Sequence, residues 1–229
     1  MGAMRKMIKN IPIVGPIAGR IYRMWLTPPK PFQGSERYWE HRYESGGHSG
    51  DGSYGRLAEF KAEILNAFVL RNGIASVIEY GCGDGNQLGL SRYPAYIGFD
   101  VSANAVSRCR ERFSGDDTKT FKLMTEYGGE TAELTLSLDV LYHLVEENVF
   151  LEYMNRLFDS ATRFVVIYSS DTDDNPEGTP SHVRHRKFSN WIKENRTGWR
   201  LLEHIPGKYP YTGDTRSGSR ANFYIYTKS

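Results

Sequence analysis

Residues 76–86, with the sequence SVIEYGCGDGN, constrain the fold of this chain more than any other stretch of its 229 residues. A short apolar run, typical of a buried strand, ends directly in the glycines Gly81, Gly83 and Gly85. Glycine is needed where the backbone turns sharply and a ligand approaches it with no Cβ in the way. We therefore expect a strand, a glycine turn and a helix in that order. This is the opening unit of an α/β sheet whose ligand lies at the carboxyl ends of the strands.

The spacing within this turn excludes one large class of ligands. A dinucleotide-binding loop of the form G-x-G-x-x-G would have its third glycine at position 86, where this chain has Asn86. The carboxylates of Glu79 and Asp84 lie close to the first glycines, and carboxylates repel phosphates but suit an ammonium group. The turn therefore predicts a ligand that carries an ammonium group and no pyrophosphate.

The hydrophobic pattern after residue 55 alternates between helix and strand. Helices are expected at 56–72, 103–113, 141–158 and 187–195, and strands at 76–80, 95–99, 120–123, 134–138, 163–168, 199–205 and 222–227. The last two strands have no helix between them, so we expect them to form a hairpin. The pattern predicts an α/β, Rossmann-like fold, with a seven-stranded, mostly parallel sheet, helices on both faces and an antiparallel C-terminal edge hairpin.

Composition excludes several other classes of protein. Hydrophobic residues make up 39% of the chain, which is enough to build a core, and a formal net charge of +2 gives no strong signal for nucleic acid. The cysteines Cys82 and Cys109 are too few for a disulfide framework, and they favour a reducing, cytoplasmic location. No apolar run reaches the ~18 to 20 residues of a membrane-spanning helix.

Residues 1–31 differ from the main domain, which we expect to cover residues 32–229. This segment has no acidic residue, and its basic residues are Arg5, Lys6, Lys9, Arg20, Arg23 and Lys30. Prolines at positions 28, 29 and 31 predict a stiff joint into the domain. Apolar residues between the basic ones predict an amphipathic helix from about residue 16 to 26. Such a helix either packs on the domain or, through residues 4–26, lies on the inner face of a membrane.

Four segments carry recognisable motifs: residues 38–43 (YWEHRY), 79–85 (EYGCGDG), 98–102 (GFDVS) and 137–144 (SLDVLYHL). The second resembles the first motif of class I S-adenosylmethionine-dependent methyltransferases, and the last is similar to the fourth motif of that family. The first resembles the W-x-x-R-Y element that some members fold over the cofactor. The resemblance extends over roughly residues 36–228 in the order of the elements.

The resemblance implies a methyltransferase with S-adenosylmethionine (SAM) as its cofactor. Asp100 would hold both ribose hydroxyls, and residues 137–144 would lie beneath the methionine part and the reactive methyl group. The segment after the third strand departs from the family, because it offers only residues 124–126 to read the adenine. The cofactor-binding residues implied by the matching motifs are Tyr38, Arg42, Glu79, Gly81, Cys82, Gly83, Asp84, Asn86, Asp100, Val101, Leu138, Asp139 and Val140.

Two residues after the fourth strand are candidates for catalysis. A sulfonium methyl group is already activated, so a general base is needed only for a hydroxyl or a protonated amine. His143 is the candidate base, because an ordinary imidazole pKa of ~6.5 suits neutral pH. Tyr142 offers an aromatic face to the positive sulfur. The alternative is that His143 packs under the cofactor or caps the following helix.

Two loops are candidates for the acceptor site. His182, Arg184 and His185 suggest an anionic or multiply hydroxylated acceptor, unless they form a solvated basic turn. The glycine-rich segment 45–55, with Tyr54, is expected to be a lid over the cofactor or acceptor, or a plain linker. No metal is expected, because the acidic residues after the fourth and fifth strands match no tight ligand motif.

These residues predict methyl transfer to a polar small molecule or a glycan, at a hydroxyl oxygen. A histidine base and a loop rich in hydrogen-bonding side chains suit a sugar-like hydroxyl group. An RNA-binding methyltransferase and a catalytically silent cofactor-binding subunit are the alternatives.

Overall fold

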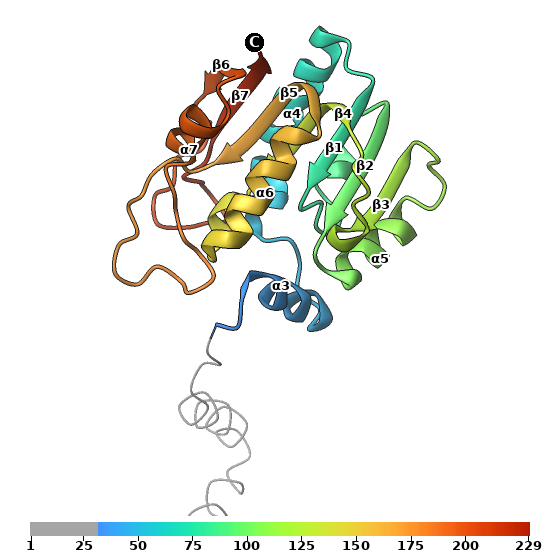
Figure 1. Ribbon diagram of the computed structural model, residues 1–229. Helices are drawn as coiled ribbons and strands as arrows, with labels where there is room; N and C mark the ends of the chain where they lie inside the picture. Colours follow the sequence, from blue (N-terminus) through green and yellow to red (C-terminus); the bar gives the residue numbers. More distant parts are fainter. Residues whose placement is uncertain (1–31) are drawn as a thin grey trace, which may run out of the picture. The chain divides into compact units, whose positions relative to one another are not determined.

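The computed structural model describes residues 32–229, which are built around one seven-stranded sheet (Figure 1). The strands lie in the order β3-β2-β1-β4-β5-β7-β6. They are β1 (Ser76–Tyr80), β2 (Ala95–Asp100), β3 (Lys119–Leu123), β4 (Ala132–Leu138), β5 (Ala161–Ser169), β6 (Trp199–Ile205) and β7 (Asn222–Lys228). Strands β1 to β5 are parallel, whereas β7 is antiparallel to both β5 and β6. The predicted Rossmann-like sheet with its antiparallel C-terminal hairpin is confirmed.

Helices cover both faces of the sheet, as predicted. The α-helices of the described part are α3 (Ser35–Glu44), α4 (Gly55–Asn72), α5 (Ala103–Arg112), α6 (Glu147–Asp159) and α7 (Phe188–Asn195). Leu65 of α4 and Val106 of α5 belong to one buried cluster, and Leu157 of α6 and Ile192 of α7 belong to a second. In Figure 1, α6 and α7 lie in front of the sheet and α4 lies behind it.

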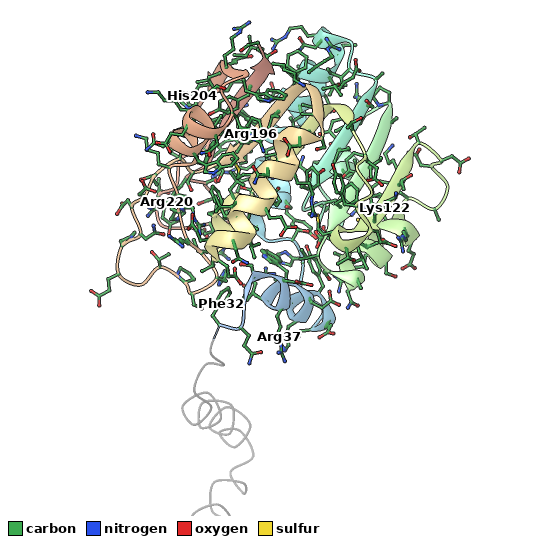
Figure 2. All side chains as sticks on the ribbon, in the orientation of Figure 1. Phe32, Arg37, Lys122, Arg196, His204 and Arg220 are labelled. Atoms are coloured by element: carbon green, nitrogen blue, oxygen red, sulfur yellow. The ribbon has the colours of Figure 1, made fainter. Side chains whose placement is uncertain are left out.

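A polar contact joins the two helices of the second cluster. Arg196, directly after α7, donates a hydrogen bond of 2.7 Å to the carboxylate of Asp159 at the end of α6 (Figure 2). Its guanidinium also lies over the ring of Phe158, 5.9 Å from the ring centre. The two helices are therefore fixed to each other at the end remote from the carboxyl ends of the strands.

The register of the sheet brings the ends of β1, β2 and β4 to one edge. Tyr80 lies opposite Phe99, and Glu79 lies opposite both Gly98 and Leu136. The loops that follow these three strands therefore lie side by side, at the edge where α/β proteins bind their ligands.

One predicted helix begins too early. The pattern predicts a single helix over 141–158, but the structure has a 3₁₀ turn, η4 (Leu141–His143), and α6 begins only at Glu147. Leu144 has φ −87° and ψ 80°, outside the helical region. The carbonyl of Tyr142 accepts a hydrogen bond of 2.8 Å from the backbone N–H of Arg184, so the loop after β5 uses a group that a longer helix would need.

Two further segments differ from the prediction. The connection after the glycine turn forms only a 3₁₀ turn, η2 (Leu88–Leu90), and no α-helix. The connection is short, and Gly89 and Pro94 disfavour helix within it. Helix α3 was not predicted, because its sequence SERYWEHRYE contains no aliphatic residue and so shows no apolar periodicity.

The basic segment 1–31 and its proline joint lie outside the described residues. The domain boundary at residue 32, the amphipathic helix and the membrane contact through residues 4–26 therefore stay predictions. None of the helices within residues 32–229 is long and apolar enough to cross a bilayer.

Candidate active site

The glycine turn after β1 has a backbone that favours glycine. Gly81 has φ 84° and Gly83 has φ 58°, in the left-handed region. The backbone N–H groups of Gly81 and Cys82 both donate to the carbonyl of Phe99 at the end of β2, at 2.7 and 3.0 Å. A Cβ on Gly81 would lie 2.5 Å from a methyl carbon of Val140. The turn thus needs glycine both for its conformation and for its contact with the loop after β4.

Asp100 ends β2 directly beside this turn. Its Oδ2 accepts a hydrogen bond of 2.9 Å from the N–H of Gly83, and its Oδ1 accepts one of 2.9 Å from the N–H of Ser102. The residue is 6% exposed, and burial raises the pKa of the carboxyl to about 6 in spite of these hydrogen bonds. A carboxylate has about four acceptor positions, so Asp100 retains capacity for two further donors.

Glu79 is a second buried carboxyl at the same place, near the end of β1. Its Oε2 accepts a hydrogen bond of 2.7 Å from the hydroxyl of Tyr96. Burial raises the pKa of Glu79 to about 7, although the Tyr96 hydroxyl and the charge of Lys61 oppose the shift. A carboxyl that is close to half-ionised at neutral pH would be stabilised in its charged form by a cationic ligand.

The segment 45–55 lies on the glycine turn. Oδ2 of Asp84 accepts hydrogen bonds from the N–H of Ser49 (3.0 Å) and from the hydroxyl of Tyr54 (2.7 Å). The side-chain amide of Asn86 donates to the carbonyl of Ser53 (2.8 Å). Burial would raise the pKa of Asp84, but the hydrogen bonds outweigh it and lower the pKa. Tyr54, predicted to contact the acceptor, thus contacts the predicted cofactor loop, while opening of the segment as a lid stays a prediction.

Helix α3 places Tyr38 and Arg42 at the same edge. The Nε of Arg42 donates to the carbonyl of His48 (2.7 Å), and its Nη1 donates to the hydroxyl of Tyr38 (3.4 Å). Glu40 accepts a hydrogen bond of 2.7 Å from Asn104 of α5 through Oε1. The other oxygen of Glu40, Oε2, is buried and has no hydrogen-bond partner within residues 32–229. A buried carboxylate oxygen without a donor marks a position that a ligand can fill.

Asp139 follows β4 in an unusual conformation. It has φ 61° and is the only residue other than glycine with positive φ within residues 32–229. Its Oδ1 accepts a hydrogen bond of 2.9 Å from the hydroxyl of Tyr142, and its Oδ2 lies 2.6 Å from Nζ of Lys61. Lys61 is not among the site residues predicted from the sequence. A signal was present, because Lys61 lies four residues from Leu57 and from Leu65 on the buried face of α4.

The geometry of His143 fixes which ring nitrogen carries the proton. Nδ1 lies 3.1 Å from the carbonyl oxygen of His182, and because a carbonyl only accepts, Nδ1 is the protonated nitrogen. The lone pair of the neutral ring is therefore on Nε2. The ring makes an edge-to-face contact with Trp39, with centres 4.9 Å apart. Burial lowers the pKa of His143 to about 4, so its imidazole is neutral at physiological pH.

The predicted acceptor histidines lie beside Tyr142 and His143. The ring of His182 lies parallel to that of His143, with centres 5.6 Å apart, and stacks on Tyr38 at 4.2 Å. His185 lies 5.8 Å from the ring of Tyr142, and its Nδ1 is 2.6 Å from the hydroxyl of Ser170. These histidines, from the loop after β5, and the candidate base after β4 therefore form one aromatic cluster.

Arg184 has different surroundings. Its Nη1 donates to the carbonyl of Val145 (3.2 Å) and lies 3.3 Å from the carboxylate of Glu147. Arg186 donates to the same carbonyl (2.8 Å). Both arginines thus hold the start of α6, and the geometry lends no support to the predicted contact between Arg184 and the acceptor.

The other predicted cofactor residues surround the glycine turn and Asp100. Cys82 and Leu138 are buried, Asn86 joins the turn to segment 45–55, and Val140 packs on Gly81. Val101 is exposed, so its side chain is accessible to a ligand.

No group of three or more His, Cys, Asp or Glu side chains suited to a metal ion occurs within residues 32–229. Asp171 accepts hydrogen bonds from the N–H (3.0 Å) and the hydroxyl (2.6 Å) of Ser189 at the start of α7. Asp173 accepts one from the N–H of Lys187 (2.9 Å). These acids therefore stabilise the end of the loop and the start of the helix.

No protein-family model matches the chain, and no curated protein matches it in sequence. Solved structures match it in fold. Magnesium protoporphyrin IX methyltransferase from Synechocystis, with bound SAM, is 14% identical with a TM-score of 0.63, over 88% of this chain and 100% of that one. The methyltransferase domain of bacterial CtHen1 is 16% identical with a TM-score of 0.60, over 76% and 100%. The N-methyltransferase NodS from Bradyrhizobium japonicum, in complex with S-adenosylhomocysteine (SAH), is 12% identical with a TM-score of 0.58, over 76% and 86%. The chain therefore has the fold of the class I SAM-dependent methyltransferases.

Proposed function

We propose that this chain is a SAM-dependent methyltransferase that transfers the methyl group to a hydroxyl oxygen of a polar small molecule or a glycan. The observation that carries the proposal is the contact between the glycine turn and Asp100, whose oxygens bond to Gly83 and Ser102. Asp100 has acceptor capacity left for two donors, and a ribose diol offers two hydroxyls on adjacent carbons. Glu79 and Asp84 at the same turn disfavour a pyrophosphate and so argue against a dinucleotide.

The surrounding residues fit the other parts of SAM. Oε2 of Glu40, close enough to raise the pKa of Asp100, offers an unfilled acceptor to the adenosine part. Glu79 favours an ammonium group, and the rings of Trp39 and Tyr142 offer faces to a sulfonium. When bound, SAM supplies a methyl group on a positive sulfur, ready for in-line displacement by a nucleophile.

The tautomer of His143 supports an oxygen acceptor. As the hydroxyl oxygen gains the methyl group, it develops positive charge, and its proton becomes strongly acidic. A neutral Nε2 on an imidazole with a pKa of about 4 is a weak base, but it is sufficient for such a proton. His182 beside His143, and His185 beside Tyr142, provide polar edges that suit an acceptor with several hydroxyl groups.

Isothermal titration calorimetry with SAM and SAH tests the cofactor assignment. Asp100→Ala should weaken both ligands by roughly 30-fold or more, because two hydrogen bonds to a carboxylate are lost. Gly83→Arg should abolish binding, because a side chain there meets Ser49 and requires φ near 58°. Asp117→Ala, which removes an exposed acid from the turn between α5 and β3, is the matched control and should bind as wild type. Wild-type affinity in both Asp100→Ala and Gly83→Arg would contradict the proposal.

Two alternatives make different predictions. An RNA-binding methyltransferase would use the basic residues of segment 1–31 and the segment 182–186, and its RNA affinity would fall steeply between low and physiological salt. A catalytically silent subunit would bind SAM but would methylate no member of a panel of hydroxylated and amine acceptors. The similar structures include a porphyrin methyltransferase and an N-methyltransferase, so the fold does not select the acceptor.

A further inference from the structure

A buried lysine lies beside the proposed cofactor site. The side chain of Lys61 on α4 is 1% exposed, and its Nζ lies 2.6 Å from Oδ2 of Asp139. Burying two charges is costly, and an apolar residue at this position would complete the face that Leu57 and Leu65 form on α4. The ion pair therefore calls for an explanation other than stability.

Asp139 connects Lys61 to the glycine turn. The next residue, Val140, packs on Gly81, and the second carboxylate oxygen of Asp139 holds the hydroxyl of Tyr142. A Cβ on Gly52 of segment 45–55 would lie 2.8 Å from Oδ2 of Asp139. The carboxylate of Asp139 thus lies near the glycine turn, segment 45–55 and the ring of Tyr142. One end of a ligand held by the glycine turn would lie at this position.

We propose that Lys61 is a positioning residue that cancels the charge of Asp139 beside the sulfonium of SAM, an inference that rests on the proposed function. Methyl transfer converts a positive sulfonium into a neutral thioether. A bare carboxylate next to the sulfur would stabilise the reactant more than the transition state, in which the charge on sulfur is already reduced, and would slow the transfer. Lys61 removes this penalty, while the second oxygen of Asp139 remains free to orient Tyr142.

The other titratable groups near this pair do not replace Lys61. Tyr142 and His143 of η4 and Tyr168 of β5 face Asp139, and Glu79 of β1 faces Lys61. Burial raises the pKa of both tyrosines and lowers that of His143, so all three are neutral at physiological pH. Within residues 32–229, loss of Lys61 would therefore leave no cation paired with Asp139.

The experiment compares the affinities for SAM and SAH, measured by calorimetry at one neutral pH. The two ligands share their amino-acid and adenosine parts and differ in charge at sulfur, so the ratio of their affinities reports the charge beside that atom. Lys61→Met removes the cation beside the carboxylate of Asp139. The ratio should then shift toward SAM by roughly tenfold relative to wild type.

Three variants complete the test. The double variant Lys61→Met/Asp139→Asn removes both charges and should restore the wild-type ratio. Asp139→Asn alone leaves Lys61 unpaired and should shift the ratio toward SAH, which keeps the inference testable if Lys61→Met does not fold. Lys119→Met, which breaks the 2.6 Å ion pair with Asp116 between α5 and β3, is the control and should behave as wild type.

Two outcomes would overturn the inference. One is a wild-type ratio in both Lys61→Met and Asp139→Asn. The other is an equal change for both ligands, which would locate the pair beside a part that SAM and SAH share. In either case binding of SAM by the wild-type protein leaves the proposed function intact, whereas failure of the wild type to bind either ligand contradicts the proposed function itself.

Discussion

Burial of a single carboxyl, Glu79, makes the stability of this protein depend on pH. The residue is 3% exposed, and its pKa is raised from 4.5 to about 7. Between these values the folded state keeps a proton that the unfolded state has lost, so the contribution of Glu79 to stability falls as the pH rises through this range. Glu79→Gln should therefore be more stable than wild type at pH 8 by about 1 to 3 kcal/mol, with a smaller difference at pH 5. Urea unfolding at the two pH values measures this.

Asp116 provides the control of opposite sign. Its side chain bonds to Lys119 and Thr118 at the protein surface, and these contacts lower its pKa to about 2. Asp116→Asn should therefore be slightly less stable than wild type at pH 8, whereas Glu79→Gln should be more stable. If Glu79→Gln were no more stable than wild type at pH 8, the buried carboxyl would have to be compensated by a cation, and Lys61 is the one that faces it.

At the scale of elements, local sequence patterns predicted the strands and the glycine turn but not α3 or η4. The strands were predicted because apolar runs of four to eight residues bounded by turn residues need only local sequence. The glycine turn was predicted because the left-handed backbone of Gly81 and Gly83 requires that residue type. Helix α3 and the turn η4 were missed, because packing of Trp39 and a hydrogen bond from the distant Arg184 define them.

The contact between segment 45–55 and the glycine turn is an element-scale property that can be tested. Tyr54→Phe removes the 2.7 Å hydrogen bond from the Tyr54 hydroxyl to Asp84. A hydrogen bond to a carboxylate at a partly exposed site contributes about 1 kcal/mol, so amides of residues 45–55 should exchange roughly fivefold faster in the apo protein. Hydrogen–deuterium exchange with mass spectrometry measures the difference.

Tyr211→Phe is the matched control, since Tyr54 and Tyr211 are both 37% exposed. Tyr211 lies in the loop between β6 and β7, and its replacement should leave exchange in 45–55 unchanged. Equal exchange in Tyr54→Phe and wild type would mean that the other contacts of the segment, such as those of Ser49 with Asp84 and of Asn86 with Ser53, hold it on the turn.

At the scale of the whole molecule, the candidate site depends on pairs of residues that are distant in sequence. Lys61 reaches Asp139 from another element, and His143 donates to the carbonyl of His182 across the loop after β5. No local pattern encodes such pairs, because the sheet topology decides which loops meet. Residues of the glycine turn and Asp100 were identified from short motifs, whereas the tautomer of His143 and the presence of Lys61 required the folded chain.

Charge divides the whole chain into two unequal parts, and this leads to a last prediction. Segment 1–31 has six basic residues and no acidic ones, and the chain as a whole has 29 basic and 27 acidic residues. Residues 32–229 therefore have 23 basic and 27 acidic residues. An anionic surface would repel the main domain and attract the first segment, by about 1 kcal/mol for each basic residue near it. The full chain should therefore sediment with anionic vesicles at about 50 mM salt and be released at about 500 mM.

A chain that begins at residue 32 should not sediment with these vesicles, yet it should bind SAM as tightly as the full chain, which also shows that it has folded. Vesicles of zwitterionic lipid are the control and should retain neither form. If the full chain fails to bind anionic vesicles at low salt, membrane contact through residues 4–26 is wrong. The basic helix would then be expected to pack on the domain, because its apolar residues must be covered by some surface other than lipid.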